Sequence, residues 1–123
     1  MRRSTFFAAF LLAGSAFLAG ANPAFAGFGA IAYDPESGKF GIASDESSQQ
    51  RADEVAQRGC ASNCKIVLRT PARLCSALAT TEDHKGYEAW ANRSRDTARL
   101  KALEACQTRA KRECTIRVAE CNR

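Results

Sequence analysis

The chain has 123 residues, which suits one small domain whose hydrophobic core would be marginal on its own. Its formal net charge is +5 at pH 7, and loss of Arg2 and Arg3 with the signal peptide described next would leave +3. A mature charge that small does not indicate a nucleic-acid partner.

The first 26 residues have the pattern of a cleavable signal peptide. Arg2 and Arg3 precede an apolar, uncharged run over 6–21, and Ala24-Phe25-Ala26 is a small-residue cleavage site. The apolar run is short for a membrane-spanning helix. We therefore expect export by the general secretory route, no membrane span after cleavage, and a secreted or periplasmic single domain over residues 27–123.

The first half of the mature chain predicts two strands, a helix and a third strand. The apolar runs 28–33 and 39–44 flank a turn rich in Pro and Gly, which is typical of a β-hairpin. Ser48 then supplies a helix cap, and a β-prone strand covers 64–69. Small apolar residues recur at helical spacing between the cap and this strand: Ala52, Val55, Ala56, Gly59 and Cys60.

The second half follows the same order. Residues 74–79 and 86–92 predict a second hairpin around a polar tip, and Ser94 caps a second helix. Its matching small residues are Ala98, Ala102, Ala105 and Cys106, and a strand follows over 114–119.

Identical spacing from cap to cysteine, Ser48 to Cys60 and Ser94 to Cys106, indicates an internal duplication. The predicted pseudo-repeats cover about 28–75 and 76–121. The predicted fold class is therefore α+β: a duplicated ββαβ unit forming one mainly antiparallel sheet, with two helices on one face and disulfide staples.

Six cysteines in a small exported chain predict a disulfide framework: Cys60, Cys64, Cys75, Cys106, Cys114 and Cys121. One pattern pairs Cys60–Cys64, Cys106–Cys114 and Cys75–Cys121, the last joining the two halves. The other pairs Cys60–Cys106, Cys64–Cys75 and Cys114–Cys121. The first is favoured because Cys114 and Cys121 would lie too far apart along a straight strand.

A metal site is the competing interpretation of the cysteines. Cys60 and Cys64 resemble half of a zinc site, and His84 could add a ligand. The paired spacing of zinc ribbons is missing and the context is export, so we expect neither metal nor cofactor.

No catalytic motif is present, and the chain is more consistent with a protein that is not an enzyme. His84, the single histidine, lies in the polar hairpin tip, where a solvated loop position is expected. Asp45, Glu46 and Asp83 could supply paired carboxylates as in glycosidases, but nothing in their spacing singles them out. Trp90 lies on an alternating strand, matches Ile42 of the first half, and is expected in the core.

The C-terminal half is rich in basic residues. They are interleaved with acidic residues, so a solvated helix face is favoured over a patch for an anionic partner. The residues are Arg95, Arg99, Lys101, Arg109, Lys111, Arg112, Arg117 and Arg123.

The order of these patterns resembles a family of small exported bacterial proteins, the domain of unknown function numbered 4189. The resemblance is carried by Gly29 to Tyr33, the Ala52/Ala56/Cys60 helix, Cys64 to Leu68, Cys75 to Ala79, Tyr87 to Trp90, and the Ala98/Ala102/Cys106 helix. It covers nearly all of the mature chain. It implies a disulfide-bonded exported module and carries no functional residues.

The leading functional hypothesis is a binding or accessory module that acts through its surface on another macromolecule, a protein or an envelope component. The alternative is a small envelope-polymer hydrolase that uses acidic loop residues with His84. A third is an envelope-surface protein held by its basic C-terminal half.

Overall fold

The computed structural model describes residues 27–123; the predicted signal peptide, residues 1–26, lies outside the described residues. Each half of the described chain has the predicted order of strand, strand, helix, strand. The elements are β1 Phe28–Tyr33, β2 Phe40–Glu46, α1 Gln49–Cys60, β3 Lys65–Thr70, β4 Cys75–Thr80, β5 Tyr87–Asn92, α2 Arg95–Ala110 and β6 Thr115–Cys121.

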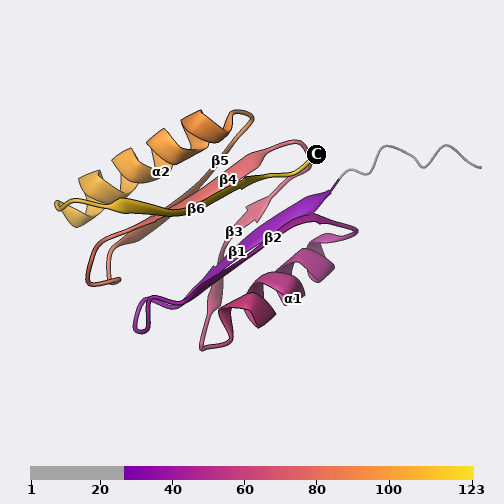
Figure 1. The fold of residues 1–123 in the computed structure, drawn as a ribbon, viewed down its shortest axis with the longest axis horizontal. Coiled ribbons are helices and arrows are strands. Elements are labelled where there is room, and N and C mark those ends of the chain that lie inside the picture. The colour runs from indigo at the N-terminus through magenta and orange to yellow at the C-terminus, as the bar shows by residue number, and fades with distance from the viewer. Residues whose placement is uncertain (1–26) are drawn as a thin grey trace, which may run out of the picture.

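The strands form two sheets, which corrects the prediction of one. Each sheet has three antiparallel strands, ordered β2-β1-β3 in the first unit (28–70) and β5-β4-β6 in the second (75–121). The helices lie on opposite outer sides with the strands between them, not on one face (Figure 1). The α+β class, the antiparallel pairing and the disulfide staples are as predicted.

Burial of the central strands on both faces explains the two sheets. In β1, Ala30 and Ala32 pack against α1, whereas Ile31 and Tyr33 face the other sheet. Leu78 of β4 joins this second cluster. Small residues therefore lie under the helices and large ones lie between the sheets. A single sheet with both helices on one face would leave Ile31 and its neighbours in water, at a cost of about 1.5–3 kcal/mol per large side chain.

Both helices begin where the caps predict. The Ser48 hydroxyl accepts a hydrogen bond from the Arg51 amide at 3.1 Å, and the Ser94 hydroxyl accepts one from the Thr97 amide at 3.2 Å. Each bond satisfies an amide that has no partner within the first helical turn. The caps therefore define the same start in both units.

The disulfides follow the first pattern. Cys60–Cys64 ties the last residue of α1, and Cys106–Cys114 ties the C-terminal part of α2, to the residue before the following strand. Cys75–Cys121 joins directly paired residues of β4 and β6. This bridge lies within the second sheet, which corrects the expectation that it joins the two halves. No cysteine within residues 27–123 is free.

Hydrogen bonds, not a disulfide, connect the units near the C-terminus. Asn122 is 7% exposed, and its side-chain amide donates to the carbonyl oxygens of Thr70 and Pro71 at 3.1 and 3.0 Å. The Asp45 amide donates to the Asn122 side-chain oxygen at 3.0 Å. One buried side chain thus links β2, the end of β3 and the chain end.

The turn between β1 and β2 is organised by Asp34. Its carboxylate accepts hydrogen bonds from the hydroxyls of Ser37 and Ser62, both at 2.7 Å, and from the Glu36 amide at 3.1 Å. The Ser37 and Ser62 bonds hold the pKa of Asp34 below its usual range. Because Ser62 follows α1, this carboxylate fixes two loops to one another.

Candidate functional site

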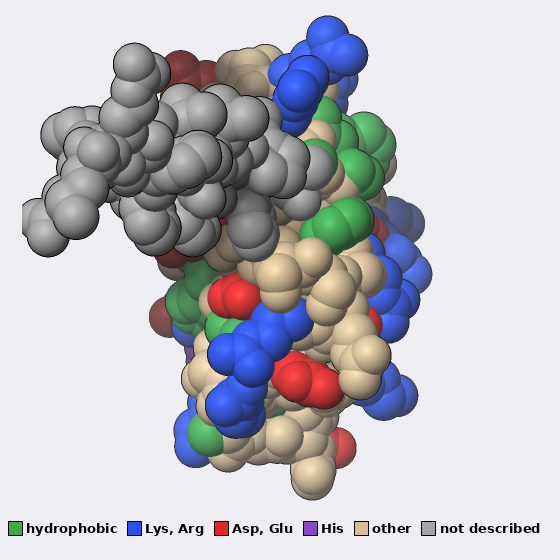
Figure 2. Space-filling model, turned by 90° about the vertical axis from the view of Figure 1, so that its right-hand side faces the viewer, with side chains coloured by type: hydrophobic (Ala, Val, Ile, Leu, Met, Phe, Trp, Pro, Cys, Tyr) green, Lys and Arg blue, Asp and Glu red, His purple; other side chains and the backbone are tan. Residues whose placement is uncertain are grey.

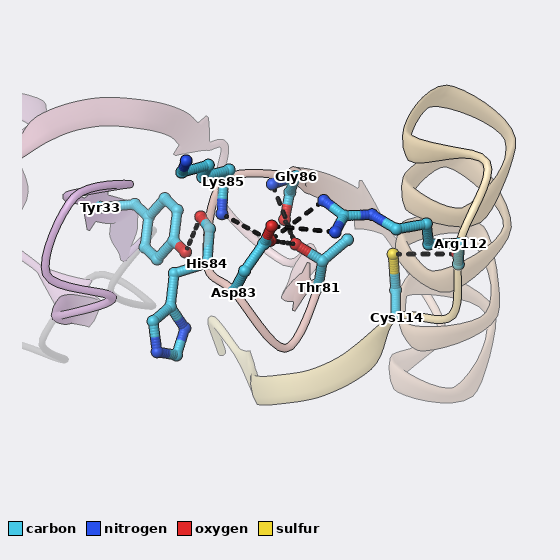
Figure 3. Close-up of polar contacts among 8 residues, drawn as sticks. All are labelled: Tyr33, Thr81, Asp83, His84, Lys85, Gly86, Arg112 and Cys114. Atoms are coloured by element: carbon cyan, nitrogen blue, oxygen red, sulfur yellow. Dashed lines mark hydrogen bonds and ion pairs between the residues drawn. The ribbon is translucent and has the colours of Figure 1, made fainter.

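The hairpin tip between β4 and β5 holds Asp83 in an ion pair. The Arg112 guanidinium donates to both Asp83 carboxylate oxygens at 2.8 and 3.0 Å, and the Thr81 hydroxyl donates at 2.6 Å (Figure 3). Arg112 first, and then Thr81, hold the pKa of Asp83 well below its usual range. The Asp83 carboxylate is therefore occupied by hydrogen bonds within the tip and by its ion pair with Arg112.

His84 is half-buried, whereas a solvated loop position was predicted. Its backbone is left-handed, with φ of 68°, and its carbonyl accepts a hydrogen bond from the Tyr33 hydroxyl at 2.6 Å. Burial raises the pKa of Tyr33, so this hydroxyl remains a donor. The imidazole points away from the Asp83 carboxylate (Figure 3). It lies over Gly38, where a Cβ would come within 2.5 Å of the ring.

Arg117 reaches from β6 across the junction between the units. Its guanidinium donates to the Gly38 carbonyl at 3.1 Å and to the Thr80 hydroxyl at 3.3 Å. One of its nitrogens lies 3.5 Å from Nδ1 of His84, and the group stacks over the Phe40 ring, 5.1 Å from its centroid. Arg117 thereby connects the second unit to the β1–β2 turn of the first.

These side chains border an open depression of about 540 Å³. From the sequence, Arg117 is one of the basic residues expected on a solvated surface, so this position at the junction is not predicted. A comparison of the two halves gives a signal for this position, because Arg117 aligns with the apolar residue Val67 of the first half. The lining residues are Ser37, Gly38, Lys39, Phe40, Gly59, Cys60, Ala61, His84 and Arg117.

The hydrolase alternative would need acidic residues beside His84, and the structure does not group them there. Asp83 faces Arg112, as described. Asp45 lies near the far end of β2, where its carboxylate accepts from the Arg123 amide at 2.6 Å, and Glu46 pairs with a helix α1 arginine. Within residues 27–123 no three side chains of His, Cys, Asp or Glu form a group that could hold a metal ion.

Trp90 lies at the surface, so its predicted core position is wrong. It is opposite Ala77 in the register, on the face that carries α2, and is 42% exposed. The buried face of α2 meets this sheet through the small side chains of Ala98, Ala102 and Cys106, which leaves no room for an indole beneath the helix. The proposed match of Trp90 to Ile42 is one residue off, because Ala43 holds the equivalent position opposite Ala30.

The indole forms one wall of a depression of about 340 Å³ between β5 and α2. Two exposed large hydrophobic side chains occur in the described part of the chain, Trp90 and Leu100, and Leu100 does not line this depression. The other lining residues are Lys101, Glu104, Ala105, Thr108 and Arg109.

The basic residues of the C-terminal half do not form a continuous patch. Four of them pair with acids: Arg109 with Glu88, Arg112 with Asp83, Lys101 with Glu104, and Arg123 with Asp45. On the end of the molecule seen in Figure 2, Lys and Arg side chains are scattered among acidic, hydrophobic and other residues. This mixture is typical of a solvated surface.

The fold and the bridges define a small α+β domain with two three-stranded sheets and three disulfides. Over residues 28–121 the chain matches the family described as Domain of unknown function (DUF4189), and it belongs to that family. It matches no curated protein and no solved structure. Among residues 27–123 no helix is long and apolar enough to cross a membrane.

Proposed function

We propose that the mature chain is an exported binding module that contacts another macromolecule through the depression beside Trp90. The observation that carries this proposal is the exposed indole itself, which lines a depression beside α2. Tryptophan and arginine are enriched at the centres of protein interfaces, where they bury large areas on binding.

The surroundings of Trp90 suit such a contact. The Arg109 guanidinium is held by Glu88 at 2.7 Å, and this hydrogen bond raises the pKa of Arg109. Lys101 and Glu104 pair at 3.8 Å on the same helix. An apolar centre with a charged, hydrogen-bonding rim is the usual anatomy of an interface. The three disulfides support a role outside the cytoplasm.

The test compares Trp90→Ala with Leu100→Ala, which removes another exposed hydrophobic side chain from outside the depression. Oxidised mature protein and both variants are immobilised and exposed to an envelope fraction and to secreted proteins. We expect the wild type and Leu100→Ala to retain one partner, and Trp90→Ala to lose affinity about 10-fold or more.

Trp90 is the only tryptophan in the chain, so its fluorescence reports directly on the same site. Addition of the isolated partner should shift the emission to shorter wavelength as the indole leaves water. If the Trp90→Ala variant folds with all three disulfides and binds as tightly as Leu100→Ala, the proposal is wrong.

A further inference from the structure

Arg117 carries a half-buried positive charge without a carboxylate partner. It pairs with no Asp or Glu within residues 27–123, although buried charges are normally paired. Its contacts are the neutral oxygens of Gly38 and Thr80, the His84 ring and the face of Phe40. A guanidinium has about five N–H donors, so these contacts leave donors available.

Arg117 extends from β6 across the junction between the two units. The register of β4 with β6 shifts between Leu78 and Ala79, which pair with Val118 and Ile116, so Arg117 is the extra residue of a β-bulge. A bulge redirects a side chain and is common beside binding sites. The Arg117 guanidinium reaches the Gly38 carbonyl in the β1–β2 turn and stacks over Phe40, which packs against the cluster between the sheets.

The depression in front of Arg117 has three nitrogen-bearing side chains in its lining, those of Lys39, His84 and Arg117, and no acidic side chain. Lys39 is exposed and, like Arg117, forms no ion pair within residues 27–123. His84 contributes an imidazole that is turned away from its acidic neighbour Asp83. The acid is near in sequence but pairs with Arg112 instead. Neither Asp nor Glu is among the residues that line the depression.

We propose that this depression binds an oxyanion, a phosphate or carboxylate group of a ligand. Arg117 would be the main charged donor because its position is fixed and half-buried, and Lys39 and the imidazole of His84 would complete the site. Charge-assisted hydrogen bonds of this kind are about twice as strong as neutral ones. The site uses none of the side chains around Trp90 and is therefore independent of the function proposed above.

The experiment follows backbone and side-chain NMR signals of the oxidised mature protein during titration with inorganic phosphate, acetate or chloride at matched ionic strength. We expect saturable shifts confined to the depression, with phosphate, acetate or both, and none with chloride. The oxyanion that produces them assigns the group. Lys39→Gln should weaken binding about 2- to 5-fold, the range for one exposed charge pair. Arg117→Gln should weaken it about 10-fold or more.

Lys85→Gln is the matched control, because Lys85 is an exposed lysine on the same tip that does not line this depression. It should leave binding unchanged. Lys39→Gln keeps the test decisive if Arg117→Gln unfolds, since the exposed Lys39 side chain forms no ion pair within residues 27–123 that the substitution would break. The proposal is overturned if chloride produces the same shifts, if neither oxyanion produces saturable shifts, or if Lys85→Gln weakens binding as much as Lys39→Gln.

Discussion

Gly41 of β2 marks the closest contact between α1 and its sheet, and Gly41→Ala should move the helix. A Cβ on Gly41 would overlap the carbonyl oxygen of Ala56 and come within 2.6 Å of the Cys60 amide nitrogen, whereas ordinary contacts measure 3.4–4 Å. Both atoms belong to the backbone of α1, so no side-chain rotation relieves the clash. The whole helix end must shift, although the Cys60–Cys64 bridge holds it to β3.

The expected loss in the free energy of unfolding follows from this clash between backbone atoms. Overpacking a core by one methyl group typically costs about 1–3 kcal/mol, and a backbone clash at a disulfide-held helix end belongs at the upper part of this range. For a domain of this size, about 2–3 kcal/mol lowers the Tm by roughly 10–20 °C. Calorimetry and urea unfolding of the oxidised protein would measure both quantities.

Gly59→Ala approaches the same contact from the helix side and should behave in the opposite way. Its Cβ would meet the Gly41 Cα at 3.5 Å, an ordinary contact. Alanine is a better helix former than glycine by up to about 1 kcal/mol, so stability should be unchanged or slightly higher. If Gly41→Ala unfolds within about 2 °C of the wild type, well inside the shift expected for 1 kcal/mol, the close-packing argument fails. Equal destabilisation by Gly59→Ala would refute it too.

Two further predictions concern the bridges and the Asp34 turn. Replacing both cysteines of Cys75–Cys121 by alanine should lower the free energy of unfolding by about 4 kcal/mol, and the same change at Cys60–Cys64 should lower it by about 2 kcal/mol. The difference comes from loop entropy, because the sequence separations are 46 and 4. Urea unfolding that gives the reverse order would contradict this prediction. Hydrogen bonds from Ser37 first, and then from a second serine, lower the pKa of Asp34. The stability that these bonds contribute is therefore complete above the usual carboxyl pKa of about 3.9, and it is lost as the pH falls through the lowered pKa. Asp34→Asn should remove that part of the acid unfolding curve and exposed Glu36→Gln should not; identical curves for both variants would exclude this role.

The order of elements could be predicted because its signals are local. Helical spacing of small residues and the serines at 48 and 94 define α1 and α2, and the turn residues define the hairpins. The predicted strand 28–33 coincides with β1. The second helix extends beyond Cys106 to Ala110.

The number of sheets depends on tertiary packing, which local pattern does not reveal. A signal was nevertheless present in β1 and β4, where apolar residues run without alternation over 30–33 and 77–79. Such runs are typical of strands buried on both faces. Once both faces of a central strand are buried, a layer is needed on each side, and the two sheets supply it for one another.

The positions of Trp90 and Arg117 could not be predicted for a different reason, because they depend on the register of the strands. A single-residue error in aligning β2 with β5 placed Trp90 with Ile42 and therefore in the core. In a strand, such a slip moves a side chain to the opposite face. Arg117 lies at a β-bulge, which periodicity does not predict, and its contacts with the β1–β2 turn depend on how the two units pack.

The first unit shows which side chains the fold itself requires at the positions of Arg117 and Trp90. The register of β1 with β3 shifts between Ile31 and Ala32, which leaves Val67 as the extra residue where the second unit has Arg117. Likewise, Ala43 takes the place of Trp90. Since the same ββαβ arrangement forms with valine and alanine at these positions, packing does not demand a guanidinium or an indole there. The second unit presents both groups toward open depressions, and this difference between equivalent positions favours recognition of a ligand over a structural role for Arg117 and Trp90.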